Sequence, residues 1–231
     1  MENNYELETV DSLKKPSSIQ EKIYSKKQKF MSELVGTTIL TFTIEVSLSL
    51  VKIQKSFLIL IPMTYLFGKI SGAHFNPAVS LPMYLRKQIN FCEFIYYFLA
   101  QFLGSILGFL LTFLCVFGDI KMLYFNRYYS INVRYFYIFL ILEIICSLIY
   151  VLIFFLLYIK EKKYDFLSVI ILGIPFYIFS SSHIIELNPI LFFPNIILAI
   201  IGNEKITIIW VYLIGPIIGG IAGGFLSKLF E

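Results

Sequence analysis

The sequence predicts an all-α membrane protein with six transmembrane helices and two re-entrant half-helices arranged as an inverted repeat. The first observation behind this prediction is composition: 58% of the 231 residues are hydrophobic, 15% are charged and the mean hydropathy is +0.80. A soluble domain carries about 25% charged and about 45–50% apolar residues, so this composition is typical of a membrane protein. The other two observations are a set of long apolar segments and an Asn-Pro pair that occurs twice.

The apolar segments predict the membrane crossings. A helix needs about 20 predominantly apolar residues to cross the hydrocarbon core of a bilayer. Segments that meet or approach this length lie at residues 30–51, 56–70, 91–117, 135–159, 164–181 and 206–229. Two further apolar stretches, of about ten residues each, follow Asn76 and Asn188. They are too short to span, so they are predicted to enter and leave the membrane on one side.

The charges predict the orientation of the chain. With the N-terminus inside, the cytoplasmic loops and tail hold 13 of the 19 Lys and Arg residues, so both termini are expected in the cytoplasm. The net charge of +4 follows from this topology and gives no reason to expect a nucleic-acid partner. The three cysteines, Cys92, Cys115 and Cys146, lack the spacing of metal ligands, so neither a metal nor another cofactor is expected.

A faint internal repeat relates the two halves of the chain. Glu33 precedes Asn76 by 43 residues, and Glu143 precedes Asn188 by 45 residues. Three spans separate the repeats, an odd number, so the second half must cross the membrane upside down, an arrangement found in transport proteins. In each half the span after the Asn-Pro pair carries glycines at four-residue spacing, which is typical of close helix packing; they are Gly104 and Gly108, then Gly215, Gly219 and Gly223.

The two repeated glutamates interrupt apolar helices, where a carboxylate is costly unless its oxygens are satisfied. The unpaired backbone N–H groups of the re-entrant loops cannot reach water, so they are the natural partners. Glu33 and Glu143 are therefore predicted to anchor these loops. A proton relay is the alternative, although no chain of acids or histidines connects the two glutamates.

The two Asn-Pro pairs are strong helix starts, because Asn is a good N-cap and Pro suits the first helical position. Asn76-Pro77 and Asn188-Pro189 must both lie inside the bilayer and face each other. Each short helix places about half a positive charge at its N-terminus, and each Asn amide offers N–H donors. Such a place binds the oxygen of a neutral solute and repels cations.

Four segments resemble one known family. The first loop reads ISGAHFNPAV over residues 70–79 and is similar, almost letter for letter, to the first signature loop of the aquaporins and aquaglyceroporins, the major intrinsic protein family. Supporting matches lie in the first, third and sixth spans, which contain SELVGT at 32–37, AQFLG at 100–104 and WVYLIGP at 210–216. Together they cover most of the chain from residue 30 onward.

The resemblance implies a passive channel for water and small uncharged solutes such as glycerol, with a pore in each subunit of a homotetramer in the lipid bilayer. It implies no enzymatic chemistry. Residues 1–29 would be a polar, disordered cytoplasmic tail, and 30–231 the channel domain, with halves at about 30–117 and 135–229. The resemblance further assigns pore and anchoring roles. The pore residues would be Asn76, Pro77, Ala78, Asn188, Pro189 and Ile190, and the anchors Glu33, Glu143, His74 and Gln101.

The second loop departs from the family pattern. Members usually read Asn-Pro-Ala-Arg, whereas this chain has Ile190 and Leu191 after its second Asn-Pro. By spacing from the two asparagines, the outer filter is assigned to Ser56, Phe176, Ile185 and Leu191, which lacks both the usual guanidinium and any histidine. An apolar ring of this kind admits the carbon backbone of glycerol if it is wide, and dewets and blocks if it is narrow.

Two other functions stay open beside the channel. Apolar bulk at Ile190 and Leu191 would suit a structural or adhesion protein that kept the fold and lost conduction. A filter without arginine would also suit altered selectivity, such as ion leak or passage of ammonia and ammonium. Two polar residues near the second loop bear on this: His183 and Glu186 form either a solvated outer vestibule, a hydrogen bond within the loop, or an attraction for cations.

Overall fold

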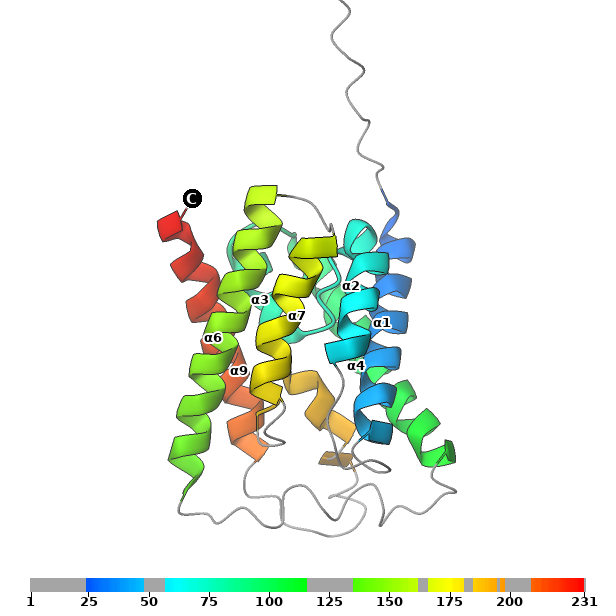
Figure 1. Cartoon of the computed structure of the whole chain (residues 1–231). Coiled ribbons are helices and arrows are strands. Elements are labelled where there is room, and N and C mark those ends of the chain that lie inside the picture. Colours follow the sequence, from blue (N-terminus) through cyan, green and yellow to red (C-terminus); the bar gives the residue numbers. More distant parts are fainter. Residues whose placement is uncertain are drawn as a thin grey trace, which may run out of the picture.

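The computed structural model describes residues 24–47, 57–115, 135–161, 166–180, 185–194, 196–197 and 209–230, and every regular element among them is helical (Figure 1). Six long helices form the bundle: α1 (Lys26–Val46), α2 (Phe57–Ser71), α4 (Phe91–Cys115), α6 (Phe136–Glu161), α7 (Phe166–Ser180) and α9 (Ile209–Leu226). Two short helices follow the Asn-Pro pairs, α3 (Pro77–Leu85) and η3 (Pro189–Phe192), and η4 (Ser227–Phe230) extends α9.

The long helices agree with the predicted spans to within a few residues. Among the described residues, three helices are long and apolar enough by themselves to cross a membrane, at Phe91–Cys115, Phe136–Tyr158 and Ile209–Phe230. Two shorter apolar helices cover Leu58–Ser71 and Phe166–Phe179. The membrane fold predicted from composition and segment length is confirmed.

The first helix begins earlier than predicted. It starts at Lys26 instead of residue 30, because Ser25 forms a capping box with Gln28. The Ser25 hydroxyl accepts the Gln28 N–H at 3.2 Å, and the Gln28 side-chain oxygen accepts the Ser25 N–H at 2.8 Å. Helix α1 therefore includes residues 26–29 of the segment expected to be a polar tail, while residues 1–23 and 48–51 lie outside the described part of the chain.

The two halves run in opposite directions. In Figure 1 the chain enters α1 and leaves α9 at the same, upper edge of the bundle, and α1 runs downward whereas α6 runs upward. The ends of the described chain therefore lie on one face. Such an arrangement follows when an odd number of crossings separates two similar halves.

The glycines show how the halves correspond. A Cβ atom on Gly104 of α4 would lie 2.7 Å from the Leu34 carbonyl of α1, and one on Gly219 of α9 would lie 2.2 Å from the Ile144 carbonyl of α6. One turn later, Gly108 and Gly223 approach the next pair of carbonyls equally closely, those of Thr38 and Leu148. Helices α1 and α4 thus pack as α6 and α9 do, and glycine is required because any side chain would push the backbones apart.

The two short helices begin in different ways. Asn76 caps α3, its side-chain oxygen accepting the Ala78 N–H at 2.8 Å, and Asn188 caps η3 in the same way through Ile190 at 3.2 Å. Helix α3 is α-helical over its nine residues, whereas the second short helix opens with the 3₁₀ turn η3 and is α-helical after it at residues 193–194 and 196–197.

Candidate functional site

The two Asn-Pro loops meet inside the bundle through a reciprocal pair of hydrogen bonds. The Asn76 side-chain amide donates to the Leu187 carbonyl at 2.9 Å. The Asn188 amide donates to the Phe75 carbonyl, also at 2.9 Å. Each asparagine therefore binds the residue that precedes the other asparagine, and the two helix N-termini are held against each other.

A strained backbone makes these contacts possible. Phe75 has φ 49° and Leu187 has φ 58°, in the left-handed region that residues with a side chain rarely adopt. Such residues cost about 1–3 kcal/mol each and persist only where the surroundings hold them. Both lie directly before an asparagine, and both offer the carbonyl that the opposite asparagine binds. The strain is therefore part of the junction between the loops.

In each asparagine, one N–H group of the side-chain amide is available to bind a solute. Its oxygen caps its own helix and one amide N–H binds the opposite loop, whereas the second N–H has no partner among the described residues. Asn76 is 3% exposed and Asn188 is 1% exposed, so these donors lie deep in the protein. Together with the two helix N-termini, they form a small electropositive centre that can bind the oxygen of a neutral molecule.

Glu33 holds the first loop from behind. One carboxylate oxygen accepts the Ser71 hydroxyl at 2.6 Å and the His74 N–H at 2.9 Å. The other accepts the Phe75 N–H at 2.7 Å and the Gln101 side-chain amide at 2.8 Å. The carboxylate is fully buried, and four donors compensate for the loss of its hydration.

Glu143 makes the corresponding contacts in the second half. Its carboxylate accepts the Glu186 N–H at 2.6 Å and the Leu187 N–H at 3.2 Å. Relative to the asparagines, these are the positions that Glu33 contacts in the first loop. The glutamates at both ends of the repeat thus bind the backbone N–H groups that come just before an Asn-Pro pair.

The first loop is completed by three residues to which the sequence analysis gave no role: Ser71, Ser80 and Tyr97. Ser80 lies 3.0 Å from both the His74 ring nitrogen and the Gln101 amide. The Tyr97 hydroxyl donates to the Ser71 carbonyl at 2.5 Å, and its ring lies 4.9 Å from that of His74. A signal was available for α4, where Tyr97, Gln101 and Ser105 recur at four-residue spacing in an apolar helix and so share one face.

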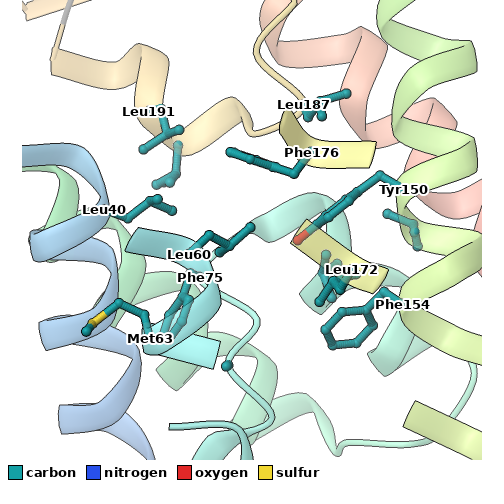
Figure 2. Close-up of a cluster of buried hydrophobic side chains, with 14 of the residues drawn as sticks. Leu40, Leu60, Met63, Phe75, Tyr150, Phe154, Leu172, Phe176, Leu187 and Leu191 are labelled. Atoms are coloured by element: carbon teal, nitrogen blue, oxygen red, sulfur yellow. The ribbon is translucent and has the colours of Figure 1, made fainter. Parts of the chain in front are cut away.

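The predicted filter positions lie in one apolar cluster where the structure describes them. Phe176, Ile185 and Leu191 are buried in the main hydrophobic cluster, together with Ile190. Figure 2 shows Leu191 and Phe176 on the interior side of their elements, in the same cluster as Leu40 of α1 and Leu60 of α2. None of these side chains can donate or accept a hydrogen bond. Ser56, the fourth predicted position, lies outside the described residues.

The outer-vestibule interpretation of Glu186 is wrong. Glu186 is 1% exposed, because its backbone N–H is held against Glu143 and the loop turns inward at this point. It stands two residues before Asn188, the position that His74 has relative to Asn76. His183 lies outside the described part of the chain.

Comparisons with known proteins point to one family. The sequence model of the family described as "Major intrinsic protein" matches residues 45–227. Glycerol uptake facilitator protein-like 6 from Lactiplantibacillus plantarum is 35% identical over 80 residues, covering 32% of this chain and 37% of that protein. The fold is similar to the X-ray structure of the aquaglyceroporin from Plasmodium falciparum, with a TM-score of 0.66 and 23% identity over 89% of this chain and 97% of that one.

The match to the bacterial relative spans little more than a third of that protein's length, and the solved structure supports the fold alone. The family model, by contrast, covers most of the chain, including both asparagines, Glu143 and the helices from α2 to α9. The chain belongs to the major intrinsic protein family, whose members are membrane channels for water or small solutes and not enzymes.

Proposed function

We propose that the protein conducts water and small uncharged solutes of the size of glycerol, passively and along their gradients. The observation that carries the proposal is the pair of uncommitted amide N–H groups of Asn76 and Asn188 at facing helix N-termini. Donors fixed in this way bind a solute oxygen without reorganising. The positive ends of the two helices oppose the passage of cations.

Glu33 and Glu143 act in this proposal as the anchors of the two loops, and His74 and Gln101 support the first. The contact distances favour this role over a proton relay, since the Glu33 oxygens accept from four donors at 2.6–2.9 Å. A carboxylate whose two oxygens accept from four donors holds those donor groups in fixed positions. In this proposal the glutamates therefore fix the geometry of the two loops that carry the asparagines.

The apolar filter bears on which solute passes. Phe176, Ile185 and Leu191, with Ser56, would form the outer constriction, and Ala78 and Ile190 would follow the asparagine level. A ring without a guanidinium favours solutes with a carbon backbone over water, because an apolar wall offers contact area and no hydrogen bonds. The name of the Lactiplantibacillus plantarum relative, a glycerol uptake facilitator, agrees with this preference.

The assembly and orientation belong to the same proposal. We expect a homotetramer in the lipid bilayer with a separate pore in each subunit and with both termini in the cytoplasm. The common face of the two chain ends in Figure 1 and the excess of Lys and Arg on the side of the tail support this orientation.

A stopped-flow experiment on reconstituted protein tests the function directly. Liposomes are shocked first with an impermeant osmolyte and then with glycerol, and light scattering follows their volume. We expect shrinkage faster than in empty liposomes, followed by re-swelling when glycerol enters. Rates equal to those of empty liposomes, from protein shown to be folded and inserted, would contradict the proposal.

A non-conducting structural or adhesion role is the second candidate. The buried apolar side chains of Ile190 and Leu191, which stand where the family usually has Ala and Arg, favour it. The uncommitted donors of the two asparagines favour conduction, because buried donors without a partner are costly in a protein that binds nothing. The same liposome experiment separates the two, and Ile190→Ala with Leu191→Ala would then restore flux only if these residues block.

A further inference from the structure

Tyr150 lies at the height where the two loops meet. On α6 it follows Glu143 by seven residues, about two turns, so both side chains emerge from the same helix face about 10 Å apart along the axis. Glu143 binds the second loop at residues 186–187, and one turn beyond Tyr150 the ring of Phe154 lies 5.6 Å from the ring of His74 in the first loop. Tyr150 therefore stands between the contacts of α6 with the two loops, level with the asparagines.

The Tyr150 side chain points into the bundle. Figure 2 shows its ring extending from α6 toward the middle of the apolar cluster, with the hydroxyl oxygen at the inner end. The ring lies 5.7 Å from that of Phe176, and Leu40, Leu60 and Leu172 belong to the same cluster. By the correspondence between Glu33 and Glu143, the matching residue of the first half is Leu40, which has no polar atom.

The Tyr150 hydroxyl has no protein partner among the described residues. Tyr150 as a whole is 3% exposed, and no described residue forms a hydrogen bond with its oxygen. The side chains of the cluster around it are apolar and offer it neither a donor nor an acceptor. The hydroxyl of Tyr97, in contrast, has a protein partner, because it donates to the Ser71 carbonyl.

The chemistry of the phenol complements that of the asparagines. The amide N–H groups of Asn76 and Asn188 are donors and can bind only the oxygen of a solute. Water, urea and glycerol also carry O–H or N–H groups, which need an acceptor when the solute leaves water. A phenol oxygen accepts as well as donates, and the neighbouring leucine and phenylalanine side chains can do neither.

We propose that the hydroxyl of Tyr150 binds the permeating solute level with Asn76 and Asn188, so that the channel favours small neutral solutes carrying O–H or N–H donors. This inference rests on the proposed channel function. The phenol oxygen accepts hydrogen bonds from the O–H or N–H groups of the solute, while the two asparagine amides donate to the oxygen of the solute. Tyr150 is then a specificity-determining residue that the first half of the repeat, with Leu40, does not duplicate.

The experiment removes the hydroxyl and keeps the ring. Tyr150→Phe is compared with wild type and with the control Tyr65→Phe, a tyrosine on α2 that is 50% exposed on the outer surface. Each protein is reconstituted at equal density, and stopped-flow light scattering gives the permeability to water, urea and glycerol together with the activation energy. We expect Tyr150→Phe to lower the permeability to the conducted solutes roughly three- to tenfold, as for one lost hydrogen bond, and to raise the activation energy.

The outcomes separate the inference from the channel function. If liposomes containing wild type or Tyr65→Phe change volume no faster than empty liposomes, the proposed channel function is refuted. If both conduct and Tyr150→Phe conducts equally well or faster, the channel stands and the role of the Tyr150 hydroxyl is refuted.

Thermal unfolding provides a second readout, because Tyr150→Phe removes no protein hydrogen bond. We expect its Tm to equal or exceed that of wild type, and a Tm several degrees lower would show that the hydroxyl has a structural partner instead. If Tyr150→Phe does not fold, Tyr150→Leu, which copies the residue at position 40, takes its place. Flux of Tyr150→Leu above that of Tyr65→Phe would make Tyr150 a steric barrier and refute the binding role.

Discussion

The two halves of the repeat share a backbone and differ in chemistry. In both, a glutamate binds the two backbone N–H groups before an Asn-Pro pair, and each asparagine reaches the opposite loop. Helix α4 adds the Gln101 amide to the Glu33 carboxylate. Gly104 of α4 and Gly219 of α9 make equivalent contacts, so the residue equivalent to Gln101 is Pro216. A proline side chain cannot donate a hydrogen bond to Glu143. The frame is therefore common to both halves, whereas the Gln101 contact of the first half is not repeated by Pro216 in the second, whose loop carries the buried Glu186 instead.

This difference separates two properties of the repeat, the loop geometry that both halves share and the interior side chains in which they differ. The loop geometry depends on contacts that backbone groups can supply, so it survives in both halves with little sequence identity between them. Side chains that face the interior are free to diverge: Ile190 stands where the first half has Ala78, and Glu186 stands where it has His74. Substitutions in the two halves should therefore affect different properties.

The largest effect is expected from Asn76→Asp. The aspartate still caps α3, but it loses the donor to the Leu187 carbonyl and places a negative charge in the electropositive centre. A buried charge without a partner costs several kcal/mol, so we expect solute flux to fall at least about tenfold. Asn90→Asp is the matched control, because Asn90 is exposed and caps α4 through its oxygen alone. Unchanged flux at normal expression would contradict a role of Asn76 in the channel.

Glu33→Gln should mainly affect stability. The glutamine side chain places an NH₂ group, itself a donor, opposite groups that now donate to the carboxylate. We expect this change to lower the free energy of unfolding by about 3 kcal/mol and to lower the Tm in detergent. Glu93→Gln is the control, since this partly exposed residue pairs with Lys29 and should change the Tm little. An equal loss in Glu33→Gln and Glu93→Gln would exclude the anchoring role.

Leu191→Arg should change selectivity and leave the fold intact. A guanidinium at this position supplies the donors and the positive charge that the filter lacks, which favours water over glycerol. We expect the ratio of glycerol to water permeability to fall roughly fivefold, the equivalent of about 1 kcal/mol. Leu191→Met, similar in volume and apolar, should leave the ratio unchanged. A ratio that rises or stays constant in Leu191→Arg would remove Leu191 from the filter.

The smallest effect is expected from Glu186→Gln, which tests whether the second loop attracts cations. Glu186 occupies the position that His74 has in the first loop, and it is buried beside the anchor Glu143. If its carboxylate draws ammonium toward the asparagines, its loss should lower methylammonium uptake by roughly twofold, with water permeability as the internal control. Uptake equal to that of wild type would end this hypothesis.

The frame of the protein could be predicted from its sequence, because it depends on residue types that have few other uses in a membrane. Glutamates in apolar helices need donors, glycines at four-residue spacing need a close neighbour, and Asn-Pro begins a helix. The start of α1 at Lys26 was also readable in the Ser25–Gln28 capping box, although the polar composition of the segment concealed it.

The junction between the loops could not be predicted. It depends on left-handed backbone at Phe75 and Leu187, two residue types that give no local sign of this conformation. Ser71 and Ser80 were missed for a related reason, since a serine is common in any loop and only the folded contacts with Glu33, His74 and Gln101 distinguish these two. The uncommitted hydroxyl of Tyr150 likewise became visible only when its neighbours were known.

The reciprocal bonds between the loops have a consequence for biosynthesis. The ribosome completes the first half long before Asn188 exists, so the Phe75 carbonyl and the Asn76 amide must wait in the nascent protein without their final partners. The Glu33 and Gln101 contacts of the first loop can form within the first half, but the two bonds between the loops need both halves. A chain interrupted between residues 116 and 134 would yield two fragments that complete these bonds only when they are made together in the same membrane.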